Sequence, residues 1–547
     1  RYSGLDSLFN VSKALSLYGV IYATRISILG INGIPRTIGL IQPLILLFLI
    51  ISWRVLVRFL LRRLNNKHYA KKGLIKAFVY GSGEAGRQLV KAMQDSQEIS
   101  ILGFLDDDEN KKDCHIDGKR IYSPINLRNL IIKKDISLVL LAIPSITRKK
   151  KSAIIKNLLS HKITVRTIPD ISNLASGKSL ITEFIDLEID DLLGRIPVEP
   201  FQSLMMRNIY SKTILVTGAG GSIGRELCLQ IIKHNPKKIL LVEISEYALY
   251  SIHEELEEFK NIDTEIIPLI GSVQDCQRME RIISIFKPET LYHAAAYKHV
   301  PIVEQNLIEG LKNNLLGTYT LAKIALDKNV NNFVFISTDK AVRPTNIMGA
   351  TKLFSELMVK EFSNSSIGKT IFSTVRFGNV IDSSGSVIPL FRTQISSGGP
   401  LTITHPDMER YFMTISEAVN LVLEASVIMK GGETFILDMG KRIKIMELAK
   451  NMIQASGLEP KDINNQKGDI EIKIVGIRPG EKIIEELTFN GSLEKTKNPL
   501  INIAKEKIKI PVDFTNKINQ IIYCIENNQE KQAIEIVDIL SKTNLKK

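Results

Sequence analysis

Acidic residues are nearly absent from the start of this 547-residue chain. No Asp or Glu occurs between Asp6 and Glu84, and residues 1–83 hold 12 Lys or Arg residues against one acidic residue. The whole chain carries a formal charge of +14, so most of the excess positive charge is local. A basic surface spread over the protein, of the kind that binds nucleic acid, is therefore not expected.

Cysteine is also scarce. The four cysteines, Cys114, Cys228, Cys276 and Cys524, are scattered and form no C-x-x-C pair. This scattered spacing is typical of reduced thiols and not of a disulfide framework or a zinc site. We expect reduced thiols in a cytoplasmic catalytic part and no metal site.

A long apolar run lies inside the basic region. Thr37–Trp53 carries no charge, and eight basic residues follow between Arg54 and Lys76. An earlier apolar stretch, residues 14–33, contains Arg25. We expect two membrane spans with the basic flank on the cytoplasmic side. The alternative, two buried core helices, stays open at this point.

The first glycine-rich turn comes soon after. In "KAFVYGSGEAGRQLVKAM", Gly81, Gly83 and Gly86 fit G-x-G-x-x-G between a predicted strand and a predicted helix. Further strands follow up to about Pro200, which indicates an α/β domain. The turn either binds a nucleotide or only packs the helix on the strand. The acids at 106–108 either meet a ribose or form a solvated turn.

The second turn has a fuller context. "KTILVTGAGGSIGRELCLQII" places Gly218, Gly221 and Gly224 between a strand and an amphipathic helix, and the next strand ends in Glu243. Such glycines let the backbone approach a pyrophosphate at the helix N-terminus. A carboxylate at the end of the second strand accepts ribose hydroxyls and repels a 2′-phosphate, so we expect NAD.

Strands and helices then alternate, which predicts a doubly wound parallel sheet with ligands at the carboxyl ends of its strands. The predicted fold is α/β: N-terminal transmembrane helices, a first Rossmann-like domain, and an NAD-binding Rossmann domain with a small C-terminal substrate-binding part. The predicted domains are residues 1–72, 73–204 and 205–547. Because the chain begins with Arg1, we expect an N-terminal piece to be missing.

A set of motifs resembles one family. "TGAGGSIG", "HAAAYKHVPIVEQN", "NNLLGT", "STDKAVRPTNIMGATK", "VRFGNV", "GSVIPLF", "HPDMERYFM" and "RPGEK" occur in this order. Together they resemble extended short-chain dehydrogenases and, more narrowly, the membrane-bound, CapD-like nucleotide-sugar 4,6-dehydratases of bacterial polysaccharide biosynthesis. The resemblance implies a multi-pass protein of the bacterial inner membrane whose catalytic domain faces the cytoplasm.

The resemblance also implies a substrate and a reaction. The substrate would be UDP-N-acetylglucosamine, and the enzyme would oxidise sugar carbon 4, remove the carbon 5 proton, expel the 6-hydroxyl as water and reduce carbon 6. Asp339 would protonate the 6-hydroxyl, Lys340 would take the carbon 5 proton, and Thr338 would lie near the 4-hydroxyl. Lys352 would bind the nicotinamide ribose.

The other residue roles follow from the same resemblance. The predicted cofactor-binding residues are Gly218, Gly220, Gly221, Ser222, Ile223, Gly224, Glu243, Ala295 and Lys352. The predicted substrate-binding residues are Lys298, Glu304, Arg376, Asn379, Arg410, Arg478 and Glu481. We expect His293 to be a packed strand-end residue and Asn314 to hold a strand and a helix in register.

Three positions depart from the usual pattern. Met348 stands four residues before Lys352, where most short-chain dehydrogenases have the acid/base Tyr. We interpret it as an apolar wall, with the proton chemistry moved to residues 338–340 and the configuration at carbon 5 retained. Asp382 stands where Gly is usual and would repel a diphosphate unless it faces away. Ser272 stands where an Asp commonly approaches the adenine.

Two rival functions stay open. One is an NAD-dependent nucleotide-sugar 4-epimerase, which normally needs the Tyr. The other is a non-catalytic membrane scaffold or regulator of glycan assembly. A sugar-phosphate transferase is a third possibility. We also expect a homo-oligomer, a dimer or larger.

Overall fold

The computed structural model describes residues 5–29, 35–69, 74–94, 96, 98–144, 146–159, 161, 163–167, 185–186, 206–260, 263–364, 369–461, 465–489, 491–506, 510 and 513–545. The chain divides into two units. The first comprises Arg1–Ile143 and Ile168–Glu183, and the second comprises Pro144–Thr167 and Phe184–Lys547. The predicted domain boundaries, at 72/73 and 204/205, lie outside the described residues and stay a prediction.

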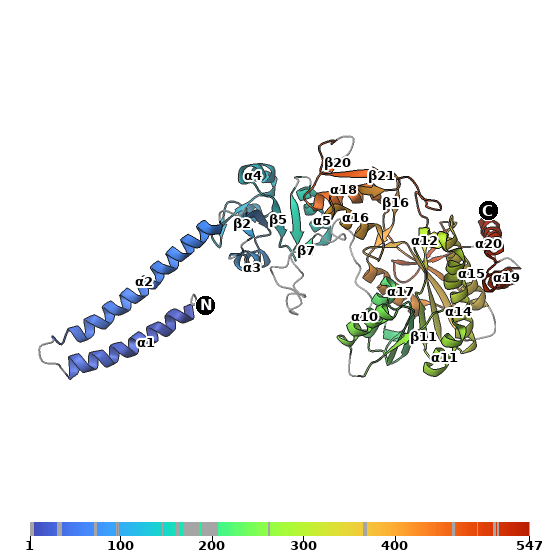
Figure 1. The fold of residues 1–547 in the computed structure, drawn as a ribbon, viewed down its shortest axis with the longest axis horizontal. Helices are drawn as coiled ribbons and strands as arrows, with labels where there is room; N and C mark the ends of the chain where they lie inside the picture. The colour runs from blue at the N-terminus through green and yellow to red at the C-terminus, as the bar shows by residue number, and fades with distance from the viewer. Residues whose placement is uncertain are drawn as a thin grey trace. The chain divides into compact units, whose positions relative to one another are not determined.

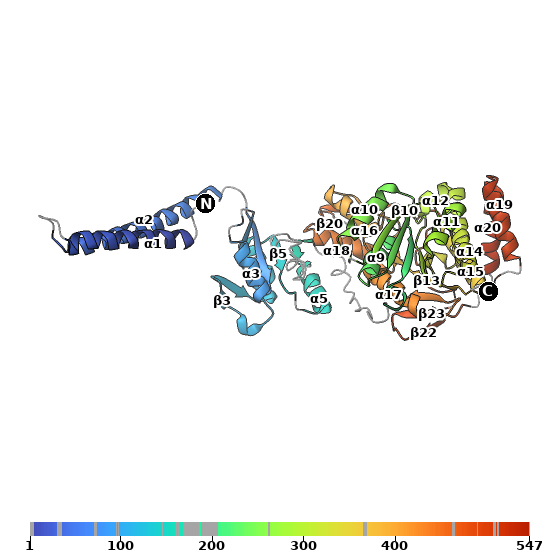
Figure 2. The same cartoon turned by 90° about the horizontal axis from the view of Figure 1, so that it is seen from below.

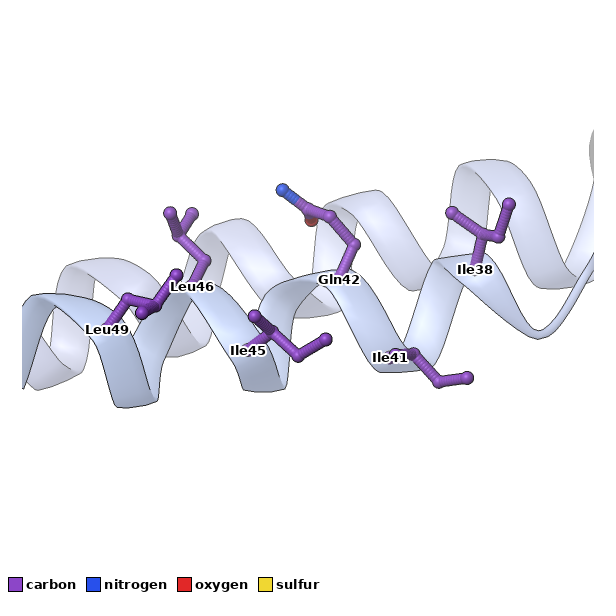
Figure 3. Close-up of a pocket in the computed structure, with 6 residues that line it drawn as sticks. All are labelled: Ile38, Ile41, Gln42, Ile45, Leu46 and Leu49. Atoms are coloured by element: carbon purple, nitrogen blue, oxygen red, sulfur yellow. The ribbon is translucent and has the colours of Figure 1, made fainter.

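The first unit begins with two helices. α1 (Leu5–Ala23) ends in a π-helical turn, Thr24–Ile28, and packs along α2 (Ile38–Tyr69) (Figure 1). Six side chains of α2 line a pocket, and these are Ile38, Ile41, Gln42, Ile45, Leu46 and Leu49 (Figure 3). Five of them are aliphatic and the sixth is an amide. The pocket therefore offers no group for acid–base chemistry.

The apolar run in α2 is too short to cross a bilayer. Its uncharged part, from Ile38 to Trp53, ends at Arg54 and rises about 24 Å at 1.5 Å per residue, against a hydrocarbon core of about 30 Å. α1 carries Asp6 and Lys13. Among the described residues, no helix is both long and apolar enough to cross a membrane. The prediction of transmembrane helices in a multi-pass inner-membrane protein is therefore wrong.

The remainder of the first unit is α/β. Its strands are ordered β3-β4-β2-β1-β5, with β1, β2 and β5 parallel. The elements are β1 (Ile75–Tyr80), α3 (Glu84–Ala92), β2 (Ile99–Leu105), β3 (His115–Ile116), β4 (Lys119–Tyr122), α4 (Leu127–Lys134) and β5 (Leu138–Leu141). The buried residues of β1 and β5 form continuous apolar runs, as expected of parallel strands covered on both faces.

The second unit contains a nine-stranded sheet in the order β10-β9-β8-β11-β12-β13-β18-β23-β22. The first seven strands in this order are parallel and the last two pair antiparallel. The strands are β8 (Thr213–Thr217), β9 (Lys238–Glu243), β10 (Glu265–Ile270), β11 (Thr290–His293), β12 (Asn332–Thr338), β13 (Ile371–Phe377), β18 (Thr434–Leu437), β22 (Leu493–Lys495) and β23 (Ile501–Ala504). The predicted doubly wound parallel sheet is confirmed.

Helices cover both faces of this sheet (Figures 1 and 2). α9 (Ser222–Ile232), α10 (Glu246–Glu257) and α17 (Ile415–Ile428) share one apolar cluster with the strands. α11 (Cys276–Phe286) and α14 (Gly317–Asp327) share a second cluster. Alternate residues of β8, β9 and β12 enter opposite clusters, as a strand covered on both faces requires.

A third cluster lies around α15 (Ile347–Asn364). It joins this helix to α12 (Val300–Gln305), α13 (Leu307–Gly310) and the π-helical turn Leu311–Leu316. The C-terminal helices α19 (Phe514–Glu526) and α20 (Glu530–Leu545) complete it. The cluster buries the face of α15 that carries Met348, and so fixes the helix on which two predicted site residues lie.

The other elements lie outside the central sheet. They are α5 (Arg148–Leu159), β6 (Thr164–Thr167), β7 (Ile185–Asp186), β14 (Asn379–Val380), α16 (Val387–Ser396), β15 (Leu401–Ile403), β16 (Glu409–Arg410), β17 (Phe412–Met413), β19 (Ile443–Lys444), α18 (Ile445–Ala455), β20 (Pro460–Lys461) and β21 (Ile470–Ile474). Short sheets join β14 to β17, β16 to β19, and β15 to β21 and β20. These pairings bring the "RFGNV" and "HPDMERYF" segments together.

Candidate active site

The order of the strands reverses beside β8. β9 and β10 lie on one side of it, and β11, β12 and β13 follow on the other. In open parallel sheets, ligands bind outside the carboxyl ends of the strands at such a switch point. The loops after β8, β9, β11 and β12 therefore define the region in which to look for a site.

The turn after β8 depends on glycine. Gly218 has φ +67°, and a Cβ added there would lie 2.8 Å from the Cα of Ala295. A Cβ added to Gly224, in the first turn of α9, would lie 1.9 Å from the carbonyl oxygen of Gly218. The strand, the turn and the helix therefore approach one another as closely as backbone allows. The N-terminus of α9 presents its amide groups at the switch point.

Glu243 closes the turn from the neighbouring strand. Its Oε2 accepts a hydrogen bond from the amide of Gly220 at 3.0 Å, and its Oε1 accepts from the amides of Ile244 and Ser245 at 2.9 and 3.2 Å. These bonds fix the carboxylate beside the glycine turn. The structure thus brings together Gly218, Gly220, Glu243 and Ala295, as predicted from the sequence.

The first turn of α9 also meets a distant loop. Gly221 is the N-cap, and Ser222 and Ile223 are the first two helical residues. The Ser222 hydroxyl oxygen accepts a hydrogen bond from the amide of Ser384 at 3.2 Å. The loop that follows "VRFGNV" therefore lies directly beside the predicted cofactor turn.

The "TDK" residues lie at the carboxyl end of β12. Lys340 Nζ is 2.9 Å from Asp339 Oδ1 and 3.1 Å from Asn379 Oδ1. The Thr338 hydroxyl donates to the same Asp339 Oδ1 at 2.9 Å. Four of the predicted site residues thus form one hydrogen-bonded group. Three of them are residues 338–340, and the fourth, Asn379, lies on β14.

The other oxygen of Asp339 has no such partner. The Asp339 side chain is 0 % exposed, and its Oδ2 makes no hydrogen bond within the described residues. A buried acceptor without a partner costs about 1–3 kcal/mol, and in a native protein it calls for a functional explanation. This oxygen therefore sets Asp339 apart within the hydrogen-bonded group.

Met348 and Lys352 lie one turn apart on α15. Met348 is 2 % exposed and belongs to the apolar cluster around this helix. Lys352 Nζ donates to the carbonyl oxygen of Ile336 at 2.9 Å and lies 4.5 Å from the ring centre of Phe335. Burial lowers the pKa of Lys352 to about 8, although nearby Glu356 opposes the change. The amine therefore sits against β12, close to the "TDK" turn.

His293 and Asn314 have structural surroundings. The two ring nitrogens of His293 lie 2.8 Å from Thr217 Oγ1 and 3.0 Å from Thr318 Oγ1. Burial, with a contribution from Lys352, lowers the pKa of His293 to about 3, so the ring stays neutral. Asn314 bonds both the amide and the carbonyl of Tyr297. It therefore fixes the loop that leaves β11.

Of the predicted sugar-pocket residues, one is already engaged. Glu304 Oε1 accepts from the amide of Ile347 at 2.6 Å, at the start of α15. Lys298 lies exposed in the loop after β11. Glu304 therefore holds the N-terminus of the helix that carries Met348, whereas Lys298 is accessible to a ligand.

The predicted arginines have different partners. Arg376 is 0 % exposed and forms ion pairs with Glu356 at 2.6 Å and Glu506 at 2.8 Å. Its guanidinium also donates to the carbonyl of Leu487. We leave Arg376 out of the proposed substrate site, because its donors are occupied inside the protein.

Arg410 is also turned inward. Its guanidinium donates to the carbonyl oxygens of Lys482 and Ile483 at 2.7 and 2.9 Å. Glu481 Oε2 accepts from the amide of Arg478 at 3.2 Å, and its Oε1 lies 3.7 Å from Arg410 Nη2. Arg410 and Glu481 therefore shape the "RPGEK" loop. Of these three residues only Arg478 is exposed.

The two residues that depart from the family pattern, Asp382 and Ser272, each have a partner within the protein. The Asp382 carboxylate pairs with Arg392 on α16 at 3.0 and 3.3 Å, and its φ of +56° explains why glycine suits the position. The expected repulsion of a diphosphate is therefore offset by Arg392. Ser272 Oγ accepts from the amide of Gln274 at 3.2 Å and so shapes its own turn.

Two charged residues near the "TDK" turn were not predicted. Lys482 Nζ donates to the carbonyl of Val342 at 2.7 Å and lies 3.8 Å from Glu485 Oε2. Glu485 is 4 % exposed. The only sequence signal was the charge-rich run "EKIIEE" after "RPG", which reads as a solvated surface segment.

Known proteins resemble this chain along most of its length. Residues 214–506 match the polysaccharide biosynthesis protein family, and residues 41–169 match a CoA-binding domain. The capsular polysaccharide biosynthesis protein CapD of Staphylococcus aureus is 41 % identical over 98 % of this chain and 88 % of its own. The probable polysaccharide biosynthesis protein EpsC of Bacillus subtilis is 38 % identical over 83 % of this chain and 74 % of its own.

A third relative matches a smaller part of the chain. The UDP-glucose 4-epimerase of Rickettsia rickettsii is 31 % identical over 59 % of this chain and 89 % of its own. The family match includes the glycine turn after β8, the "TDK" turn and the "RPGEK" loop, and the CapD match extends over both units. The predicted CapD-like resemblance is confirmed, and the chain belongs to the polysaccharide biosynthesis protein family.

Proposed function

We propose that this chain is an NAD-dependent nucleotide-sugar 4,6-dehydratase that acts on UDP-N-acetylglucosamine and retains the configuration at sugar carbon 5. Its product would be a UDP-4-keto-6-deoxy-N-acetylhexosamine for a bacterial surface polysaccharide or glycan. The observation that carries the proposal is the Asp339–Lys340 pair, 2.9 Å apart at the end of β12, with one buried Asp339 oxygen left without a partner.

The turn after β8 fits NAD. Gly218 and Gly224 leave no room for side chains between the strand and the helix, so a pyrophosphate can reach the amides of α9. Glu243 would accept the adenosine ribose hydroxyls and would repel the 2′-phosphate of NADP. When bound, NAD supplies the reversible redox chemistry of the sugar.

The protein's own residues supply the proton transfers. Lys340 is the base for the proton at carbon 5, and Asp339 is the acid for the departing 6-hydroxyl. Their 2.9 Å separation places the amine and the carboxyl side by side, so both can act on one bound sugar. The free Asp339 Oδ2 is the atom left to meet the hydroxyl.

Thr338 and Lys352 position the reacting sugar and the cofactor. The Thr338 hydroxyl bonds Asp339 Oδ1 at 2.9 Å, so it can orient the carboxyl while it contacts the 4-hydroxyl. Lys352 would bind the nicotinamide ribose from its place against β12. Met348 has no proton to give and contributes apolar volume to α15.

The substrate diphosphate needs exposed cations. Lys298 is exposed in the loop after β11, and Arg478 is exposed in the loop after β21. Arg guanidinium groups suit phosphate oxygens. Arg478 is therefore our choice for the diphosphate, with Lys298 and Asn379 nearer the sugar.

A 4-epimerase is the main rival, because a Rickettsia UDP-glucose 4-epimerase is among the relatives. The two activities differ in the mass of the product. Purified protein would be incubated with UDP-N-acetylglucosamine and no added NAD. A dehydratase yields a product lighter by one water, whereas an epimerase leaves the mass unchanged. Release of NADP in place of NAD from the denatured protein would contradict the cofactor assignment.

A further inference from the structure

Two ionisable residues from the segment after "RPG" come into the active centre. Lys482 Nζ donates to the carbonyl of Val342 at 2.7 Å, and the amide of Val342 donates to the carbonyl of Asp339 at 3.1 Å. Lys482 is thus tied to the backbone of the catalytic turn. The Arg410 guanidinium donates hydrogen bonds to the carbonyl oxygens of Lys482 and Ile483. The segment is therefore held at its backbone by Arg410 and at the Lys482 side chain by Val342.

Glu485 adds a second buried carboxylate beside this turn. It is nearly fully buried, its Oε2 lies 3.8 Å from Lys482 Nζ, and that oxygen makes no hydrogen bond within the described residues. Asp339 Oδ2 is also buried and makes no hydrogen bond within the described residues. Two buried carboxylate oxygens near one catalytic turn that accept no hydrogen bond within the described residues point to a charge cluster that functions as a unit.

We propose that Lys482 and Glu485 form a second ionisable pair that belongs to the active centre, and that Glu485 is a positioning residue which sets how the Asp339–Lys340 pair holds its protons. This inference rests on the proposed function, because it assigns Asp339 and Lys340 their acid and base roles. Neither Lys482 nor Glu485 needs to touch the sugar.

The charges around Glu485 support this role. Four charged groups interact electrostatically with Glu485, and these are Lys340 and Asp339 in the catalytic turn, Arg410 in β16 and Lys482 in its own segment. Burial, reinforced by Asp339, raises the pKa of Glu485, while the three cations oppose the change. Burial also lowers the pKa of Lys482, against the attraction of Glu485, Glu486 and Asp339. Ionisation of Glu485 therefore changes the field at the catalytic turn.

The direction of the effect follows from charge. Once Glu485 is ionised, its negative charge favours retention of protons on the neighbouring pair. Glu485→Gln keeps the shape and removes this charge, so the alkaline limb of kcat/KM should move to lower pH. For charges several ångströms apart beneath a protein surface, a shift of about one pH unit is expected. KM should change less than about twofold, because the diphosphate is held elsewhere.

The test compares the pH profiles of wild type, Glu485→Gln and Glu494→Gln. Glu494 is a half-exposed carboxylate paired with Lys505, and its loss should leave the profile unchanged. Glu485→Asp retains the charge and should restore most of the wild-type profile. If Glu485→Gln does not fold, Glu485→Asp still tests the proposal. The alkaline limb of kcat/KM in Glu485→Asp should lie within about 0.3 pH units of that of wild type. A larger displacement would overturn the proposal.

A second readout separates this proposal from the function itself. Infrared spectra of protein labelled with ¹³C-glutamate should show a protonated carboxyl band that titrates above the range of ordinary carboxylates and is missing from Glu485→Gln. An inactive wild type that shows this band would overturn the dehydratase assignment alone. An active wild type whose pH profile matches that of Glu485→Gln would overturn the role of Glu485.

Discussion

The glycine-rich turn after β1 and the one after β8 are built alike. Gly81 has φ +103° and Gly218 has φ +67°, and each follows a buried parallel strand. Asp106 stands 25 residues after Gly81, as Glu243 stands 25 residues after Gly218. In both turns this carboxylate accepts a hydrogen bond from a turn amide, that of Ser82 in the first and Gly220 in the second.

The two turns differ in what surrounds them. Asp106 accepts from both the amide and the hydroxyl of Ser82, accepts from the amide of Asp108, and lies 3.7 Å from the Lys111 ammonium. Burial by itself would raise the pKa of Asp106. The hydrogen bonds from the Ser82 hydroxyl and from the amides of Asp108 and Ser82 outweigh it and hold this pKa below its usual range. Glu243 forms no salt bridge within the described residues. The helix after the first turn begins with the acidic Glu84, whereas the helix after the second begins with Ser222.

The comparison shows that a glycine turn does not by itself define a catalytic site. Within the described residues, the second turn has a close Asp–Lys pair on a nearby strand end, formed by Asp339 and Lys340, the proposed acid and base. At the corresponding edge of the first unit, Asp107 accepts a hydrogen bond from Tyr80 and lies in a local acidic turn. The following predictions test whether catalysis depends on the second turn alone.

The largest effect is expected at the catalytic pair. Asp339→Asn and Lys340→Ala should each reduce turnover by about 10²–10⁴, the usual contribution of a general acid or base, while the amount of bound NAD stays near that of wild type. Asp107→Asn, the matched change in the first unit, should leave turnover within about twofold. Steady-state kinetics and nucleotide analysis measure both quantities. If Asp107→Asn lost as much turnover as Asp339→Asn, the proposed difference between the two turns would be wrong.

A second effect concerns stability and pH. The pKa of Lys352 is about 8 in the folded protein, below its value of about 10.4 in an unfolded chain. The unfolded state therefore binds more protons between these values, and stability should rise from pH 8 to about pH 10 by up to about 3 kcal/mol. Below pH 8 this gain is lost. Urea unfolding at several pH values measures it.

The control for this prediction is an exposed lysine of the first unit. Lys352→Met should flatten the rise in stability with pH, because it removes the titrating group without removing much volume. Lys76→Met should not, since Lys76 is half-exposed and paired with Asp135 on the surface. An unchanged pH dependence in Lys352→Met would show that another group causes the rise.

The third effect compares the two glycine turns directly. Gly218→Ala forces a side chain into a positive φ at 2.8 Å from Ala295, and should reduce retained NAD by about tenfold or more. Gly81→Ala meets a similar obstacle, at 2.7 Å from the carbonyl oxygen of Ala142, and should leave NAD retention unchanged. Loss of NAD from both variants would mean that the first turn supports the cofactor as well.

The smallest effect is expected at Met348. Met348→Leu keeps the buried volume and should change turnover less than about threefold. Met348→Ala should destabilise the protein by about 2–5 kcal/mol, the usual cost of truncating a buried methionine, and should lower turnover further. If Met348→Leu were as damaging as Lys340→Ala, the sulfur would have a chemical role that this mechanism does not give it.

Much of the second unit could be predicted from the sequence. Strands alternate with helices on a regular spacing, so the parallel sheet and its carboxyl-edge loops follow from the pattern. Because parallel strands end at one edge, "STDK" and "RFGNV" could be expected to lie near each other. Lys340 and Asn379 do meet there, at 3.1 Å.

The remainder depends on long-range partners that local sequence does not reveal. Arg376 lies in a motif that suggests phosphate binding, but its carboxylates come from α15 and from residue 506, far along the chain. The sequence predicted no role for Lys482 or Glu485, and the fold places Lys482 against the carbonyl of Val342. The apolar run in α2 suggested a membrane span through its hydropathy, but no described helix is both long and apolar enough to cross a membrane.

The most direct test of the central claim is the reaction in heavy water. Purified protein would be incubated with UDP-N-acetylglucosamine in D₂O and the product analysed by mass spectrometry and NMR. The mechanism predicts loss of one water, one deuterium at carbon 5, and the original configuration there, because Lys340 removes and returns the proton from one face. A product of unchanged mass, or an inverted carbon 5, would contradict it.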